Sequence, residues 1–174
     1  MKKQDAAIVI GHDWTRKGAF SPHLNKSEYD YNKLVALNTG CDVFSHTPNV
    51  SYRRKMRSTY RNLSEYAITL ELHFNAALSH VQGAEALYFH TNTHGAESAK
   101  LFSDMVSKEY SIKDRGAKPL SNSNQRGYWA VASGVPTGLI LEPFFGSHKA
   151  AVDFNDVCRY SNLLIDFIEN LNYR

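Results

Sequence analysis

Cysteine is scarce in this chain of 174 residues: only Cys41 and Cys158 are present, far apart and without a CxxC pair. A disulfide framework needs several cysteines at regular spacing, so the sequence argues against one. It also argues against a zinc site built from thiolates, which needs clustered cysteines. We expect both residues to be buried free thiols, because free cysteine behaves as a small hydrophobic side chain.

Long hydrophobic runs are also lacking. The first apolar run covers only residues 6–10 and follows two lysines, whereas the hydrophobic region of a secretory signal has roughly 7–15 residues. No other stretch approaches the ~20 apolar residues needed to span a membrane. We therefore expect no signal peptide, no membrane insertion and synthesis in the cytoplasm.

Charge of either sign is moderate. The net charge is +3, the sequence pI is about 8.8, and charged residues make up 21% of the chain. The densest basic cluster, from Arg53 to Arg61, has helical spacing, so we interpret it as a solvated helix face and expect no nucleic-acid partner. Salt-sensitive binding of a polyanion through this cluster is the weaker alternative.

No repeat, linker or low-complexity segment interrupts the sequence, and its length fits one domain. Short apolar, β-branched runs predict strands at 6–10, 42–45, 67–73, 84–89, 128–132 and 137–141. Apolar residues at helical spacing predict helices at 28–38, 52–66, 96–110 and 150–171, and polar residues predict a loop at 113–126. This alternation indicates a single α/β domain with a mostly parallel, twisted sheet of about six strands.

Three residues with catalytic or metal-binding chemistry lie at the ends of predicted strands. His12 follows the first strand, His73 ends the third, and Glu142 follows the last. The carboxyl ends of parallel strands meet at one edge of a sheet, where functional sites gather. We therefore expect these three side chains to lie close together.

Glu28 stands at the start of the first predicted helix and completes a set that zinc favours, two histidines and one glutamate. Glu142 could then serve as base and acid, because amide hydrolysis needs a group that moves protons. Each residue also has an ordinary structural interpretation. A single histidine beside a strand is more often a loop or core residue, and Glu28 would by default stabilise the helix dipole.

Five short motifs occur in order along nearly the whole chain. They are Gly11-His12 after the first strand, Glu28 at a helix start, His73-Phe74-Asn75-Ala76, the Gly-x-Glu strand at 83–89, and the segment 136–144 that carries Glu142. In this order they resemble the zinc N-acetylmuramoyl-L-alanine amidases of the autolysin type, which occur in bacterial cell-wall remodelling and in phage lysins. No single motif is specific, but the ordered set is a strong signal.

The resemblance implies an α/β domain with helices on both sides of a six-stranded sheet. It also implies Zn²⁺ held by His12, Glu28 and His73, with Glu142 as the catalytic base and acid. The reaction would be cleavage of the amide bond between N-acetylmuramic acid and L-alanine in bacterial peptidoglycan. Residues 1–174 would form one catalytic domain without a separate wall-binding domain and act as a monomer.

A chain of this kind without a signal peptide is similar to a phage endolysin, which is made in the host cytoplasm and acts on the cell wall after release. Two alternatives stay open. A zinc carboxypeptidase or another peptide deacylase could use the same ligands. A non-catalytic wall-binding protein could keep the same fold.

The sequence departs from the family pattern at three places, one of which is Pro143, in the position of a small residue after Glu142. Asp13 replaces a glycine after the first histidine, and we expect it to form a turn or to support a metal ligand. Glu71 is unusual before His73, and strand alternation predicts that its carboxylate lies at the surface or against a helix. Further residues are expected either to line the substrate groove or to be ordinary surface groups: His23, Arg115, Arg126, His90 and His94.

Overall fold

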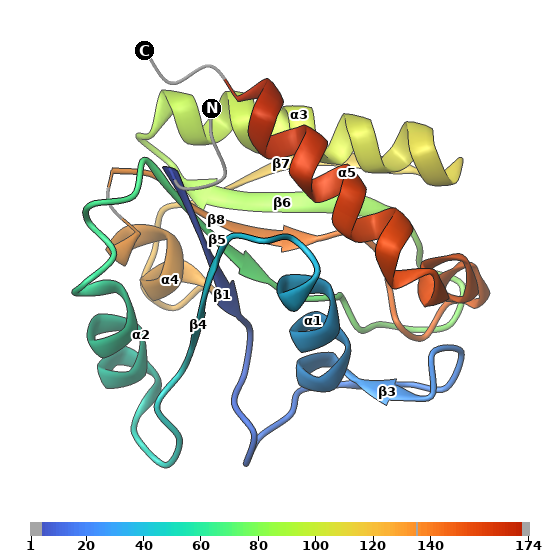
Figure 1. The fold of residues 1–174 in the computed structure, drawn as a ribbon, viewed down its shortest axis with the longest axis horizontal. Helices are drawn as coiled ribbons and strands as arrows, with labels where there is room; N and C mark the ends of the chain where they lie inside the picture. The colour runs from blue at the N-terminus through green and yellow to red at the C-terminus, as the bar shows by residue number, and fades with distance from the viewer. Residues whose placement is uncertain (1–4, 135, 172–174) are drawn as a thin grey trace.

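A six-stranded sheet forms the centre of the computed structural model, which describes residues 5–134 and 136–171 (Figure 1). The strand order is β4-β1-β5-β8-β6-β7. The strands are β1 (Ala6–Ile10), β4 (Asp42–Ser45), β5 (Ile68–Leu72), β6 (Ala84–Phe89), β7 (Asp114–Leu120) and β8 (Gly138–Glu142). β4, β1, β5 and β8 are parallel, whereas β6 is antiparallel to β8 and carries β7 parallel to itself. The predicted mostly parallel sheet is therefore confirmed.

Helices cover both faces of this sheet. They are α1 (Glu28–Leu37), α2 (Tyr52–Tyr60), α3 (Thr93–Tyr110), α4 (Tyr128–Ser133), α5 (Val157–Asn170) and the 3-10 helix η2 (Lys149–Asn155). Alternation along β1 separates two cores: Ile8 packs in the core that includes α1, α3 and α5, whereas Val9 packs in the core that includes α2 and α4. All of β1 is buried, as expected for a strand between two helical layers.

Residues 128–132 form part of helix α4, so the strand predicted there is wrong. The amide groups of Ala130 and Val131 donate hydrogen bonds to the carbonyl of Gly127, and both side chains are buried. Over so few residues, an apolar run has no period that distinguishes a helix from a strand. Packing beside α2 and β8 decides the conformation here.

The loop predicted at 113–126 is wrong in its first half, which forms the edge strand β7. Its sequence contains aspartate, glycine, lysine and proline, all of which are disfavoured in strands. An edge strand pairs on one side only, so Pro119 is tolerated there and pairing with β6 is sufficient. The polar composition of residues 114–120 therefore led to the prediction of a loop where strand β7 forms.

Helix boundaries differ from the prediction in three places. Helix α3 begins before residue 96 because the side chain of Asn92 accepts a hydrogen bond from the amide of Gly95 and caps the helix. Helix α2 ends at Tyr60 rather than at residue 66. The last predicted helix is divided into η2 and α5, because Asp156 caps α5 by accepting from the amide of Arg159.

Two further expectations concerned the cysteines and membrane insertion. Neither Cys41 nor Cys158 forms a disulfide, but Cys158 is exposed and Cys41 is only half-buried, so the predicted burial of both thiols is wrong. Within residues 5–134 and 136–171, no helix is both long and apolar enough to cross a membrane.

Candidate metal centre and active site

His12, Glu28 and His73 converge at the carboxyl edge of the sheet, as expected from the sequence. His12 follows β1 in a left-handed backbone conformation, with φ of 67°, and His73 follows β5. Glu28 is the first residue of α1, after Ser27, whose side chain accepts from the amide of Asp30. A tight cap thus fixes the helix end that carries the carboxylate.

The Glu28 carboxylate lies between the two imidazole rings. Its Oε2 is 3.0 Å from His12 Nε2 and its Oε1 is 2.7 Å from His73 Nδ1. The amides of Ala19 and Phe74 also donate to this carboxylate, at 3.2 Å each. One donor atom from each of the three side chains lies within 4.8 Å of the others. Two imidazoles and one carboxylate that converge in this way could hold a divalent cation.

Two glycines allow these side chains to approach. A Cβ atom on Gly11 would come within 2.6 Å of the His73 ring. A Cβ atom on Gly18 would come within 2.6 Å of both Glu28 Oε2 and the His12 ring, and Gly18 has a φ of +77°. The backbone therefore wraps the triad closely, and only glycine fits at either position.

The pKa values of the triad keep a negative charge on Glu28, which a cation site needs. Burial alone would raise the pKa of Glu28, but hydrogen bonds from His12 and His73 outweigh burial and lower the pKa to about 2. Burial lowers the pKa of His73, yet hydrogen bonds to Glu28 and Glu71 hold it well above its usual range. The site thus keeps its carboxylate ionised and attracts positive charge, which fits the donor set.

Glu142, the last residue of β8, lines the same cavity, which has a volume of about 770 Å³. Its Oε2 is buried and has no hydrogen-bond partner among the described residues. Burial, opposed by the nearby His73 and reinforced by Glu28 and Glu85, raises the pKa of Glu142 to about 8. A buried carboxyl oxygen without a partner, on a residue that lines a cavity and has a raised pKa, marks a candidate functional group.

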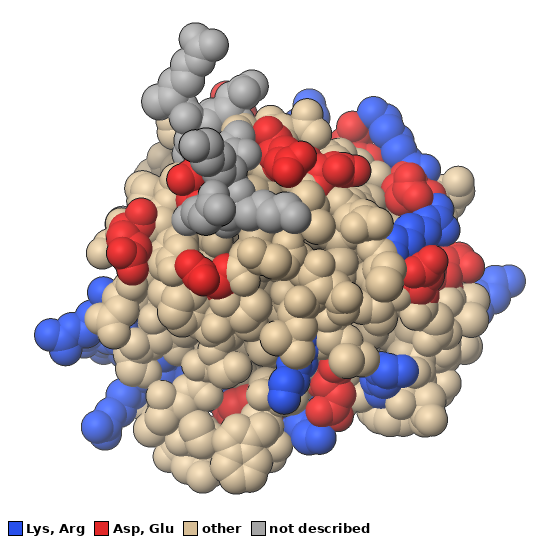
Figure 2. All heavy atoms as spheres, viewed as in Figure 1, with Lys and Arg blue, Asp and Glu red and all other residues tan. Residues whose placement is uncertain are grey.

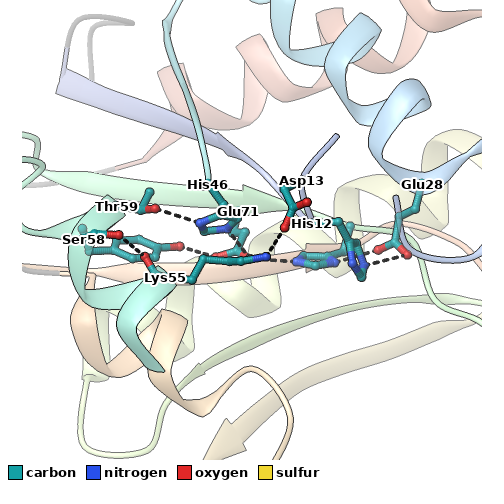
Figure 3. Close-up of polar contacts among 10 residues, drawn as sticks. His12, Asp13, Glu28, His46, Lys55, Ser58, Thr59 and Glu71 are labelled. Carbon is teal, nitrogen blue, oxygen red and sulfur yellow. Dashed lines mark hydrogen bonds and ion pairs between the residues drawn. The ribbon is translucent and has the colours of Figure 1, made fainter. Parts of the chain in front are cut away.

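A buried polar network lies behind His73 and was not predicted. Glu71 Oε1 is 2.9 Å from His73 Nε2 and 3.2 Å from His46 Nε2, and the Tyr60 hydroxyl donates to Glu71 Oε2 at 2.5 Å. Figure 3 shows these contacts running from Thr59 and His46 through Glu71 toward Glu28. Glu71 faces α2, so the helix-facing interpretation is confirmed and the surface interpretation is wrong. His46 directly follows the strand at 42–45, the same signal that identified His12.

Asp13 forms the expected turn: its carboxylate accepts from the amides of Thr15 and Arg16 and pairs with Lys55. Lys55 therefore does not belong to a fully solvated helix face, although four arginines of that cluster are exposed.

Of the other candidates, Arg126 lines the cavity, whereas Arg115 is bound to Glu85, with 2.7 Å between Nε and Oε2. His23, His90 and His94 are exposed.

No family model matches the sequence, and neither does any curated protein. Solved structures do match. The catalytic domain of an endolysin targeting Clostridia difficile superposes with a TM-score of 0.76 at 22% identity, covering 97% of this chain and 98% of that one. The CwlD amidase from Clostridioides difficile, solved in complex with the GerS lipoprotein, gives 0.75 at 17% identity, covering 95% and 97%.

A third match is the catalytic domain of CwlV, an N-acetylmuramoyl-L-alanine amidase from Bacillus (Paenibacillus) polymyxa. Its TM-score is 0.68 at 16% identity, and the alignment covers 99% of this chain and 100% of that one. These matches extend over nearly the full length of each partner. The chain therefore has the fold of the N-acetylmuramoyl-L-alanine amidases seen in these solved structures.

Proposed function

We propose that this protein is a zinc-dependent N-acetylmuramoyl-L-alanine amidase that hydrolyses bacterial peptidoglycan. The observation that carries the proposal is the convergence of His12, Glu28 and His73 beside Glu142, in a fold shared with solved amidases. Fold alone would not assign an activity, because one fold supports many functions. The donor set and the adjacent carboxyl group add the chemistry.

His12 Nε2, a Glu28 carboxylate oxygen and His73 Nδ1 would hold the metal. Zinc bound there supplies Lewis-acid chemistry, polarising the scissile carbonyl and lowering the pKa of water. The short contacts of Glu28 to both rings keep the three donors together before the metal arrives. Such preorganisation reduces the ordering that binding requires.

Glu142 would take the proton from the attacking water and deliver it to the nitrogen of L-alanine as the amide bond breaks. Proton transfer in both directions is most efficient when the pKa of the group lies near the working pH. The raised pKa of Glu142, about 8, fits this role.

The cavity offers room for a glycopeptide as well as for the reacting amide. Its wall includes the amide side chains of Asn124 and Gln125 and the guanidinium of Arg126, next to Phe74 and Asn75. Arginine binds carboxylates through paired hydrogen bonds. A stem peptide with acidic groups would therefore be held against the 124–126 side, and we propose an endolysin-like role on the wall of a bacterial host.

The decisive experiment combines metal analysis with product analysis on purified peptidoglycan, with and without a chelator. We expect one zinc per chain and new L-alanine amino termini, and both should disappear after chelation. Single amino acids released from stem-peptide carboxyl termini would instead identify a carboxypeptidase. Wall binding with no product of either kind would reject an enzymatic function.

A further inference from the structure

Glu71 is buried in the floor of the cavity, between β5 and α2, and is only 2% exposed. It is not a member of the donor set formed by His12, Glu28 and His73, but it contacts one of them. His73 presents one nitrogen to each side: Nδ1 to Glu28 and Nε2 to Glu71. The two carboxylates thus contact opposite edges of one imidazole ring.

From this arrangement we infer that Glu71 is a positioning residue that fixes the tautomer and orientation of His73 for metal binding. The inference rests on the proposed zinc site. A neutral imidazole carries one proton, so a ring that offers Nδ1 to a metal must keep its proton on Nε2. The Glu71 carboxylate accepts a hydrogen bond from that Nε2–H and increases the basicity of the ring, as carboxylates behind metal-binding histidines commonly do.

Glu71 is itself held in place by groups that belong to other elements. The Tyr60 hydroxyl from α2 and the His46 ring after β4 both contact its carboxylate, and Thr59 Oγ1 lies 2.8 Å from His46 Nδ1. A buried carboxylate without such partners would be strongly destabilising. The number of partners indicates that the ionised group is maintained at this position.

The test is the Kd for zinc, measured by chelator competition, for the wild type and for Glu71→Gln. We expect the Kd to rise by about 10- to 100-fold in the variant. In the zinc-loaded wild type, nitrogen NMR should show His73 protonated at Nε2, and this signal should weaken or shift in Glu71→Gln. Glu85→Gln is the matched control, since Glu85 lines the same cavity but contacts Asn75 and Arg115 instead.

An unchanged Kd in folded Glu71→Gln, or an equal loss in Glu85→Gln, would overturn the inference. If Glu71→Gln does not fold, Tyr60→Phe removes one hydrogen bond to Glu71 and should raise the Kd severalfold; no change there would also overturn it. Failure of the proposed zinc site is distinguishable, because the wild type itself would then bind no zinc; a zinc enzyme with another substrate would leave the expected change in Kd intact and be identified by its products.

A second, independent feature lies on the other side of α2. Arg53, Arg54, Arg57 and Arg61 are exposed and line a groove of about 760 Å³ together with several serines. Figure 2 shows basic side chains projecting from the lower left of the molecule, where α2 lies in Figure 1. Within the described chain, none of these four guanidinium groups forms an ion pair.

Like charges at i and i+4 destabilise a helix, and Arg53, Arg57 and Arg61 form such a row. We propose that this groove binds a phosphodiester-linked polyol chain of the kind attached to bacterial walls. Guanidinium and hydroxyl groups are suited to phosphate oxygens. Tyr60 is the one aromatic residue in the described lining of the groove, and it is buried. The ring of the neighbouring Trp129 already has the Arg53 guanidinium over it, 4.5 Å from the ring centre, so bases of a nucleic acid would find little free stacking surface.

Binding to poly(glycerol phosphate) and to single-stranded DNA of equal charge, over a range of salt, tests this proposal. We expect the polyol phosphate to bind more tightly than the DNA. The double variant Arg57→Gln/Arg61→Gln should weaken binding at least fivefold and lower the salt slope by about 0.7–0.9 per lost contact. Lys33→Gln/Lys100→Gln removes the same charge from exposed sites elsewhere and should have little effect.

Equal losses in the two double variants would show a general charge effect and overturn the proposal. Tighter binding of DNA, or no binding of the polyol phosphate, would overturn it as well. The cleavage of a short soluble muropeptide should be unchanged in Arg57→Gln/Arg61→Gln, so a failure of this proposal is separable from failure of the amidase assignment.

Discussion

Glu28 Oε1 and His73 Nδ1 lie 2.7 Å apart although 45 residues separate them in the sequence. The contact joins the start of α1 to the end of β5 and brings a helix-terminal carboxylate to the edge of the sheet. The candidate metal site therefore depends on the packing of α1 against the sheet.

Glu142→Gln should keep zinc and lose catalysis. The amide cannot accept a proton, so wall hydrolysis should fall by about 10²–10⁴-fold, the usual contribution of a positioned acid–base group. Release of L-alanine termini measures activity, and metal analysis checks the site. A variant with near wild-type turnover would remove Glu142 from the mechanism.

His73→Ala should lose the metal as well as the activity. It removes one of three donors, and a site with two protein ligands holds zinc weakly. Zinc content after dialysis is the measurement, and His90→Ala is the control because His90 is an exposed histidine outside the cavity. Normal zinc content in His73→Ala would contradict the assignment.

Zinc binding should release a proton at neutral pH. The pKa of His73 lies well above its usual range in the metal-free protein, so the ring is protonated at pH 7 and must lose one proton to bind zinc. Affinity should therefore rise with pH until the raised pKa of His73 is passed, and then level off. Calorimetry in two buffers of different ionisation enthalpy gives the proton count; a count of zero at pH 7 would be incompatible with this.

Gly18→Ala should damage the site more than Gly116→Ala. Both residues have a positive φ, +77° and +76°, so alanine costs about 1–2 kcal/mol at either position. Only at Gly18 would the new Cβ atom meet Glu28 and His12, whereas nothing lies within 4 Å at Gly116. Thermal unfolding and zinc Kd, measured on both variants, separate backbone strain from displacement of the ligands; similar zinc Kd values would argue against a tight triad.

The ends of the buried strands could be predicted from the sequence, because each apolar run stops at a polar residue or a glycine. This signal located His12 and His73, and the predicted sheet edge brought them together as observed. The same signal was present at His46, after the strand at 42–45, but no accompanying motif drew attention to it. Its role depends on Glu71, which lies on a different strand, and such a pairing follows from the strand order alone.

The errors have a common physical origin. In α4 and β7 the local sequence preference opposes the conformation that the tertiary structure selects. Aromatic and apolar residues at 128–132 favour a strand, and polar residues with Pro119 disfavour one. Both segments are short, so packing against neighbouring elements outweighs intrinsic preference.

Helix α2 lies between the arginine groove and the cavity that holds the candidate metal site, and we expect a ligand in each. Tyr60 lines the arginine groove and donates a hydrogen bond to Glu71, which contacts His73. A polymer that shifts α2 on binding would therefore change zinc affinity, and thermodynamic linkage requires zinc to change polymer affinity by the same factor. If both proposals hold, this one helix would couple binding of the polymer to the zinc affinity of the proposed metal site.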